Sequence, residues 1–282
     1  MKGISRRGPG TSVHHNTLWV CISVGLLLSW PAVSLGAVLY GAGSMGSGWD
    51  RLVRIDPETA MGTQVGLFGP GCYIYALSDS DMSGYLYGAG SGPSGLGLFK
   101  ISMDTGAATW IGQSGGYVYD SLAYDEYTDT LYASVPYGYL YQVNQETGAM
   151  IRMWQFSGPT VQSITWSEHG LIGDSYGTFY RIETPTGPYV TMIPLFNSGA
   201  SGWGLACDPD LNDGDFNYAN ANINNLCRVR GMDGATINVG PFRFTGTGQS
   251  FMVYDLAYAP EPSTLVLLTG LGALLLRRRT RR

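Results

Sequence analysis

A short apolar segment with Leu and Tyr at its centre recurs along the middle of the chain. The five copies are Val38-Leu39-Tyr40-Gly41, Tyr85-Leu86-Tyr87-Gly88, Thr130-Leu131-Tyr132-Ala133, Gly170-Leu171-Ile172-Gly173 and Phe216-Asn217-Tyr218-Ala219. The second residues of successive copies lie 47, 45, 40 and 46 residues apart. Periods of about 40–50 residues are typical of propeller blades and of solenoid turns.

Each copy opens a longer unit in which polar and apolar residues partly alternate, as on half-buried strands. In the second unit, Leu98-Phe99-Lys100-Ile101 is followed by the turn Met103-Asp104-Thr105-Gly106. Ala107 to Gly112 then forms a third strand-like segment, and Asp120 to Tyr124 forms a fourth. Gly suits the positive φ of tight turns, and the preceding polar residue can bond the turn backbone. The pattern predicts four short strands per unit and no helix between the two chain ends.

The ends of this repeating region predict how it closes. The region starts at the Leu39-Tyr40 strand and finishes at Asp255-Leu256-Ala257-Tyr258, so each end lacks the strand that the other supplies. Pairing these two strands completes one unit and removes the open sheet edges that would template aggregation. We therefore expect an all-β domain over 37–259, a five-bladed β-propeller of four-stranded repeats. An open β-solenoid is the alternative, although its rungs usually have shorter periods.

The first 36 residues have the layout of a secretory signal peptide. Lys2, Arg6 and Arg7 precede an apolar helix from Leu18 to Trp30, and Ser34-Leu35-Gly36 offers small residues before a mature chain that starts at Ala37. The Arg pair could indicate twin-arginine export, but the apolar residues expected after it are missing. We favour ordinary secretion, with signal peptidase as a processing partner.

The last residues combine a Pro-rich hinge, a short apolar helix and a basic tail. Pro260-Glu261-Pro262 precedes the apolar run Leu265 to Leu276, and the tail carries Arg277, Arg278, Arg279, Arg281 and Arg282. Arg residues just past an apolar helix hold that end in the cytoplasm. The run is shorter than the roughly 20 residues of a typical membrane span. An ordinary tail anchor is the alternative to the sorting signal considered next.

This arrangement over residues 260–282 resembles the PEP-CTERM sorting signal of Gram-negative bacterial surface proteins. The resemblance implies recognition by the membrane protease exosortase, and transient anchoring in the inner membrane through the C-terminal helix. It also implies a final location at the cell surface or in the extracellular, exopolysaccharide matrix. It covers only this segment and implies nothing about the activity of the repeat body.

Charge and cysteine content limit the partners of the body. Residues 37–259 hold 8 of the 16 basic and 20 of the 21 acidic residues, so their net charge is −12. Phosphate backbones repel such a body, so we expect no nucleic acid partner. Three cysteines remain after signal removal, Cys72, Cys207 and Cys227. The repeat register makes a Cys207–Cys227 bridge unfavourable, because it places the two residues on strands separated by a third.

The strands expected to line the central channel carry the candidate ligand-binding residues. One channel position holds Ile74, Asp120, Gln162, Trp203 and Tyr254, and the next holds Tyr75, Ser121, Ser163, Gly204 and Asp255. From this mixed set we select Asp120, Gln162, Ser163 and Asp255 as candidates to bind a cation or a sugar. The alternative is that they hydrate the channel or bond neighbouring blades.

Two further segments carry polar chemistry. Asp208, Asp210, Asn212, Asp213 and Asp215 resemble a calcium loop, since alternating carboxylates and amides can surround Ca²⁺. The position that needs Gly in an EF-hand is Asp213, so an exposed acidic turn is the alternative. His169 is the one histidine of 37–259, and its turn context favours a solvated residue over a general base. We assign no catalytic residue.

Together these features predict a secreted, surface-sorted propeller that acts as a binding or structural module of the envelope or exopolysaccharide matrix. A polysaccharide or a surface protein is the expected partner. The alternative is a lactonase-like propeller hydrolase with a divalent cation in the channel. An enzyme should gather several carboxylates around one point of the channel, whereas a binding module should spread aromatic and polar residues over a face.

Overall fold

The computed structural model describes residues 37–46, 48, 50–80, 84–183, 187–199, 202–208, 216–220, 224–231 and 233–260. The helices predicted near the two chain ends lie outside these residues. Every regular element within them is a β-strand, which confirms the all-β class for this part of the chain. None of the described residues belongs to a helix that is long and apolar enough to cross a membrane.

The strands form consecutive antiparallel groups of four, which we number as repeats 1 to 5 from the innermost strand outward. Repeat 1 contains β21 (Met252–Pro260), β1 (Ala37–Ser44), β2 (Arg51–Ile55) and β3 (Met61–Leu67). Repeat 2 contains β4 (Tyr73–Ser78), β5 (Tyr85–Gly92), β6 (Gly95–Ser102) and β7 (Ala108–Gln113). Repeat 3 contains β8 (Ser121–Asp125), β9 (Thr130–Val135), β10 (Tyr139–Val143) and β11 (Met150–Phe156).

Repeat 4 contains β12 (Ser163–Ser167), β13 (Gly170–Ser175), β14 (Thr178–Glu183) and β15 (Tyr189–Asn197). Repeat 5 contains β16 (Gly202–Cys207), β17 (Phe216–Asn220), β18 (Asn225–Val229) and β19 (Thr236–Pro241). The two-residue strand β20 (Arg243–Phe244) pairs in parallel with β3 at the edge of repeat 1. Strands β11 and β15 also pair in parallel, which joins the outer edges of repeats 3 and 4.

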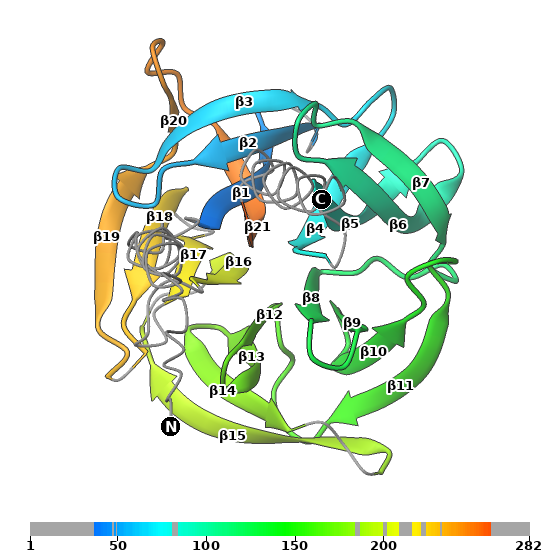
Figure 1. Ribbon diagram of the computed structural model, residues 1–282. Coiled ribbons are helices and arrows are strands. Elements are labelled where there is room, and N and C mark those ends of the chain that lie inside the picture. Colours follow the sequence, from blue (N-terminus) through cyan, green and yellow to red (C-terminus); the bar gives the residue numbers. More distant parts are fainter. Residues whose placement is uncertain are drawn as a thin grey trace, which may run out of the picture. The chain divides into compact units, whose positions relative to one another are not determined.

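The repeats are arranged radially around a common centre, as Figure 1 shows. Strands β21, β4, β8, β12 and β16 lie innermost, and β3, β7, β11, β15 and β19 lie at the perimeter. Radial repetition of four-stranded antiparallel sheets defines a β-propeller. The propeller fold predicted from the sequence is thus the fold of the described residues.

Both ends of the domain contribute to repeat 1. Strand β1 pairs antiparallel with β21, and the register runs from Ala37 opposite Pro260 through Leu39 opposite Tyr258. This is the pairing that the incomplete units at the two ends predict. It closes the ring with strands that lie more than two hundred residues apart in sequence.

The apolar core lies between neighbouring repeats. Within the described residues the buried apolar side chains separate into clusters, each of which combines two adjacent repeats. Representative pairs are Leu52 with Phe99, Tyr87 with Leu131, Leu140 with Ile164, Phe179 with Phe216, and Leu226 with Val53. Burial of these faces is the main favourable term in folding, and it requires every repeat to have a neighbour on both sides.

The recurring Thr-Gly turns have a second role beside turn geometry. Gly112 on β7 lies so close to the next repeat that a Cβ atom there would overlap the carbonyl oxygen of Thr147. Gly66 on β3 stands in the same relation to Thr105. The turn of one repeat therefore packs directly on the outer-strand backbone of the repeat before it, which only glycine allows.

The structure corrects the fifth copy of the sequence repeat by one residue. Phe216 pairs with Val229 as Leu39 pairs with Ile55, so Phe216, and not Asn217, is the counterpart of Leu39. The sequence misleads here because Tyr218 takes the place of the recurring Tyr when the letters alone are aligned. Strand β17 lies between β16 and β18, so Cys207 and Cys227 are on non-adjacent strands, as the register predicts.

Candidate functional site

The carboxylate of Asp255 lies where the innermost strands converge. It accepts hydrogen bonds from the backbone N–H groups of Leu77 (2.8 Å) and Leu256 (2.9 Å), and the Ser121 hydroxyl oxygen lies 3.2 Å from it. The backbone N–H of Leu205 bonds it as well. These residues come from β4, β21, β8 and β16. One fully buried side chain thus connects the inner edges of four repeats.

Ser121 extends this connection to repeat 4. Its hydroxyl oxygen accepts a hydrogen bond from the backbone N–H of Ile164 on β12 at 3.1 Å. The innermost strand of a propeller has no partner strand on the channel side, so its N–H groups need other acceptors. Asp255 and Ser121 provide acceptors for N–H groups of the inner strands β4, β16, β21 and β12, and Ser121 itself belongs to the fifth inner strand, β8.

Burial raises the pKa of the Asp255 carboxyl well above its ordinary value. The hydrogen bonds from Leu77, Leu256, Ser121 and Leu205 favour the ionised form and oppose this rise. Ser163, which occupies the position of Asp255 in repeat 4, is also buried. Two of the four predicted ligand-binding residues therefore lie inside the packed centre, where their surroundings are protein atoms.

The other two candidates, Asp120 and Gln162, lie one position earlier, directly before β8 and β12, where their side chains are only partly buried. We call this position of the five repeats the channel mouth. The same position holds Tyr75, Trp203 and Tyr254 in the remaining repeats. The ring centroids of Trp203 and Tyr254 are 5.2 Å apart, and those of Tyr75 and Tyr254 are 6.0 Å apart in an edge-on arrangement. The mouth therefore combines an aromatic cluster from three repeats with a carboxylate and an amide from the other two.

The sequence alignment places the repeat 2 member of each ring one residue too early. The N–H of Leu77 reaches Asp255 as that of Leu205 does, so Tyr75 matches Asp120 and Ala76 matches Ser121. The alignment instead offers Ile74 and Tyr75. The pairing of β4 with β5 skips Tyr75, and the polar and apolar pattern gives no sign of this bulge.

All three aromatic residues of the mouth lie at β-bulges. The pairing of β4 with β5 skips Tyr75, and the pairing of β16 with β17 skips Trp203. The pairing of β21 with β1 skips Tyr254 and Asp255. At this position Asp120 precedes β8 and Gln162 precedes β12. These two strands pair with β9 and β13 without a shift in register. Bulges re-aim side chains and are over-represented beside functional sites.

Asp120 is half-buried, and burial raises the pKa of its carboxyl to about 7. No ion pair or side-chain hydrogen bond joins its carboxylate to any other described residue. The pKa of the Tyr254 phenol is raised to about 12. Burial is the largest cause, and the negative charges of Asp120 and Asp255 add to it. Gln162 accepts a hydrogen bond from the backbone N–H of Tyr176 at 3.3 Å.

Further aromatic side chains surround the mouth at the same end of the strands. Tyr137 and Tyr176 are at the tips of the β9–β10 and β13–β14 turns, where their side chains are 80% and 70% exposed. Both residues have positive φ, 104° and 51°, a conformation that is uncommon for any residue but glycine. Exposed Tyr at strained turn tips is a cost in stability that binding surfaces tolerate.

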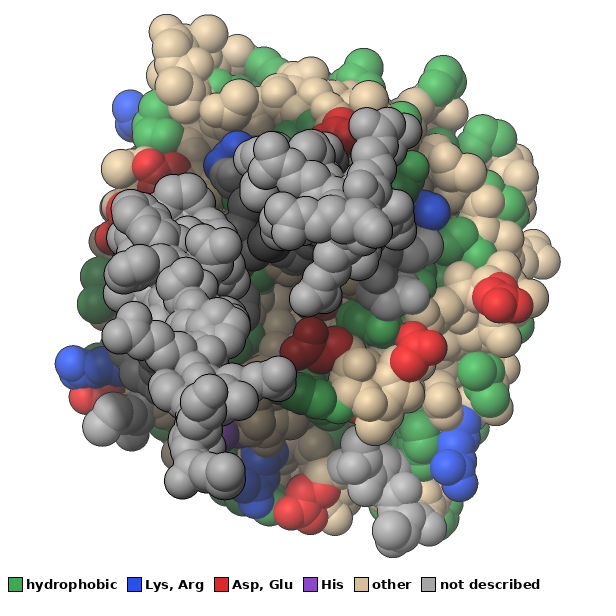
Figure 2. All heavy atoms as spheres, viewed as in Figure 1, with side chains coloured by type: hydrophobic (Ala, Val, Ile, Leu, Met, Phe, Trp, Pro, Cys, Tyr) green, Lys and Arg blue, Asp and Glu red, His purple; other side chains and the backbone are tan. Residues whose placement is uncertain are grey.

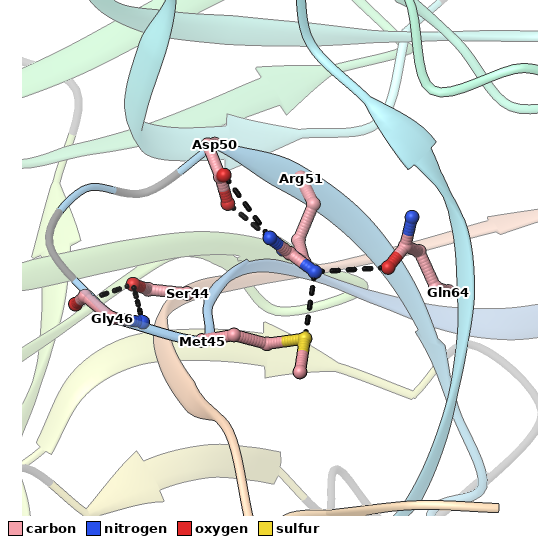
Figure 3. Close-up of polar contacts among 6 residues, drawn as sticks. All are labelled: Ser44, Met45, Gly46, Asp50, Arg51 and Gln64. Carbon is pink, nitrogen blue, oxygen red and sulfur yellow. Dashed lines mark hydrogen bonds and ion pairs between the residues drawn. The ribbon is translucent and has the colours of Figure 1, made fainter.

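The basic residue at the start of β2, Arg51, is already paired with an acidic residue. Figure 3 shows the Arg51 guanidinium bonded twice to Asp50, at 2.8 and 3.1 Å, and to the Gln64 side-chain oxygen at 2.9 Å. The same group contacts the sulfur of Met45 at 2.8 Å. The charge of Arg51 is therefore compensated by Asp50.

Charge on the molecular surface agrees with the acidic composition. On the face shown in Figure 2, Lys and Arg side chains lie singly at separate places and form no continuous basic patch. A basic stripe is the usual footprint of nucleic acid binding.

The structure describes His169 and one residue of the predicted calcium loop, Asp208. His169 is in the turn between β12 and β13, its side chain is 67% exposed, and its Nε2 lies 3.6 Å from Glu168, which confirms the solvated turn. Asp208 accepts a hydrogen bond from the Tyr258 hydroxyl, while Asp210, Asn212, Asp213 and Asp215 lie outside the described residues. Across the described part of the chain, no three His, Cys, Asp or Glu residues are placed to hold a metal ion.

Of the sorting motif, Pro260 ends β21, and Glu261, Pro262 and the Arg residues of the tail lie outside the description. The three mouth aromatics are not among the binding candidates predicted from the sequence, because recurring Tyr and Trp residues are usually explained by core packing. Their signal is positional. They share one channel position with the two polar residues that the analysis did select.

Comparison with known proteins supports the fold and nothing finer. No family model and no curated protein matches the chain. Among solved structures, a chain of a nidogen/laminin complex aligns with a TM-score of 0.53 at 12% identity, over 79% of this chain and 98% of that chain. A glutaminyl cyclase from Myxococcus xanthus aligns with a TM-score of 0.42 at 14% identity, over 71% of this chain and 75% of its own.

The WD40 β-propeller domain of Doa1 aligns with a TM-score of 0.36 at 13% identity, over 58% of this chain and 53% of that one. At such identities the likeness concerns the fold alone.

Asp255→Ala tests the central connection. The variant leaves the N–H groups of Leu77, Leu205 and Leu256 buried without their acceptor. Because each of the three unsatisfied buried donors costs about 1–3 kcal/mol, we expect the free energy of unfolding to fall by about 3–9 kcal/mol in urea titrations. Asp255→Asn keeps one acceptor oxygen and should lose less. A loss below about 1 kcal/mol for Asp255→Ala would contradict the assignment.

Stability should fall as the pH rises from 5 to 8. Burial raises the pKa values of Asp79, Asp120 and Asp174 to about 7, above the ordinary 3.8, so the folded chain binds more protons than the unfolded chain in this window. Asp120→Asn removes one of these groups and should reduce the fall, as measured by urea denaturation at several pH values.

Asp233→Asn is the control for this experiment. The pKa of Asp233 is lowered, mainly by its hydrogen bond with Arg230, so this residue is ionised in both states between pH 5 and 8. Its replacement should leave the slope unchanged. A slope that Asp120→Asn does not alter would show that its carboxyl is not held in the protonated form.

Proposed function

We propose that the protein is a secreted, surface-sorted β-propeller that binds polysaccharide at the aromatic channel mouth. The observation that carries this proposal is the placement of Tyr75, Trp203 and Tyr254 at bulges on three inner strands, all at one channel position. Sugars present C–H faces that pack on aromatic rings and hydroxyls that need polar partners. Asp120 and Gln162 offer such partners beside the rings.

The mouth fits a binding module better than a closed catalytic pocket. Binding sites combine apolar and aromatic walls with a few placed polar groups. Trp203 is 39% exposed, and the turn-tip residues Tyr137 and Tyr176 widen the aromatic surface beyond the channel. Such a spread of aromatic and polar residues is what we expect of a binding module, and it supports the proposal.

The proposal takes each repeat as one blade, which gives a five-bladed propeller. Its support is that the inner strands of all repeats meet at Asp255 and Ser121. With five inner strands the centre is narrow enough for two side chains to bond every inner strand. The ligand-binding surface would then be the mouth and not the interior of the channel.

The proposed export and sorting agree with how the domain closes. The expected first residue of the mature chain, Ala37, pairs with Pro260 of the sorting motif. A chain cut before Ala37 and after Pro262 would thus keep all strands of the fold. Signal peptidase and exosortase are the processing partners of this proposal, and its destination is the cell surface or matrix of a Gram-negative bacterium.

A binding screen tests the proposed ligand class. We expect the full-length chain in mild detergent to retain at least one exopolysaccharide or oligosaccharide on a glycan array. Trp203→Ala should weaken that binding about tenfold, which corresponds to roughly 1.4 kcal/mol. Tyr127→Ala, which removes a 76% exposed ring from the β8–β9 turn, is the matched control. Equal binding by the parent chain, Trp203→Ala and Tyr127→Ala would contradict the proposed site.

Cell fractionation tests the proposed destination. An epitope placed after Ala37 should appear in the outer envelope or the medium of the host, on a chain shortened at both ends. Replacing Pro260, Glu261 and Pro262 by Ala should hold the protein in the inner membrane with its tail attached. Recovery of the tagged chain in the cytosol would refute export.

A further inference from the structure

We propose that the channel mouth is specific for a cationic sugar, whose free ammonium group lies between the Asp120 carboxylate and the ring of Tyr254. This inference deepens the proposed polysaccharide binding and rests on it. It names the ligand class as amino sugars that carry no N-acetyl group, in place of neutral sugars in general.

The Asp120 carboxylate has no positively charged partner among the described residues. Asp120 is half-buried at the mouth, and no described residue forms an ion pair or side-chain hydrogen bond with its carboxylate. The basic groups whose contacts are known have other partners: Arg51 bonds Asp50 and Gln64, and Lys100 lies 3.8 Å from the ring centre of Tyr85. A partly buried carboxylate without a counter-charge is unfavourable, and a bound cation would relieve that cost.

Aromatic rings occupy positions next to Asp120 at the mouth. Asp120 and Tyr254 directly precede Ser121 and Asp255, whose side-chain oxygens lie 3.2 Å apart, so the two residues occupy neighbouring backbone positions at the mouth. The charge of Asp120 also contributes to the raised pKa of the Tyr254 phenol. Tyr254 in turn lies between Trp203 and Tyr75, with centroid distances of 5.2 and 6.0 Å. Ring faces attract ammonium groups within about 6 Å of the centroid, and Trp and Tyr do so most strongly. A cation beside Asp120 would thus meet both a carboxylate and a π face.

The residues of the mouth suit an ammonium group better than a metal ion. Ca²⁺ takes six to eight oxygen ligands and Mg²⁺ a near-octahedral set, whereas the mouth offers one carboxylate, one amide and three rings. The other carboxylate at the centre of the ring, Asp255, is fully buried and accepts hydrogen bonds from its neighbours. The amide of Gln162, one repeat away, is suited to a sugar hydroxyl. An N-acetylated sugar would carry no charge and would leave Asp120 uncompensated.

Calorimetric titration of the full-length chain in mild detergent tests the inference. The ligands are a fully de-N-acetylated glucosamine oligomer and an N-acetylglucosamine oligomer of the same length, at neutral pH. We expect the de-N-acetylated oligomer to bind at least about tenfold more tightly, because only its free ammonium group can form a charge-assisted hydrogen bond with the Asp120 carboxylate. Asp120→Asn should remove this preference, and Trp203→Ala should weaken binding of the de-N-acetylated oligomer.

The control must exclude general attraction of a cationic oligomer to an acidic protein. Glu126→Gln makes the same charge change on an exposed residue at the opposite end of β8 and should leave the preference intact. Equal losses in Glu126→Gln and Asp120→Asn would overturn the site. Gln162→Glu adds a carboxylate at the mouth and should strengthen binding of the de-N-acetylated oligomer.

The outcomes distinguish this inference from the proposed function. If the N-acetylated oligomer or a neutral polysaccharide binds through Trp203 and Asp120→Asn has no effect, the cationic specificity is wrong while polysaccharide binding stands. If no glycan of any charge binds, both fail. Asp120→Asn removes a carboxyl that folding holds in a costly environment, so a melting temperature at or above that of the parent chain would verify that the variant is folded.

Discussion

The fold depends on the satisfaction of the inner strand edges at the centre of the ring. Every innermost strand presents N–H groups on the side where no further strand follows, and a buried donor without an acceptor is costly. Asp255 accepts from β4, β16 and β21, and Ser121 accepts from β12 while it contacts Asp255. Two side chains thereby fix the height of all five inner strands. Gly204 permits this, since a Cβ there would lie 2.5 Å from the Cα of Asp255.

The same height constraint places the candidate site. Once the strands are aligned at Asp255, the residues one position earlier must form a ring at the channel mouth. Bulges at three of these positions carry the aromatic residues, and bulges increase the local twist and change the direction of side chains. The residues at the height of Asp255 are therefore buried, while those one position earlier are partly or largely exposed. A one-residue slip of any inner strand would exchange these two environments.

The sequence revealed the repeats, the four strands in each and the pairing of β1 with β21, because these follow from apolar periodicity and from incomplete units at the two ends. It did not reveal the bulges, since Tyr75 and Trp203 occupy single inserted positions that leave the surrounding pattern unchanged. It selected Asp120 and Gln162 for their polarity, and it selected Asp255 for the same reason although that carboxylate is buried. Polarity at a channel position does not distinguish a ligand-binding group from one that bonds backbone donors. That distinction depends on tertiary hydrogen bonds.

The two ends of the inner strands have different roles under the proposed sorting. Tyr254 is near the start of β21 and Pro260 is its last residue, so the aromatic mouth and the exit toward the sorting motif lie roughly 20 Å apart along one strand. Ala37 pairs with Pro260, so the site of signal cleavage is at that same far end. A domain held to a membrane or matrix through its tail would then present the mouth on the opposite side. Attachment and ligand binding could thus operate together, because the strand that closes the ring also separates them.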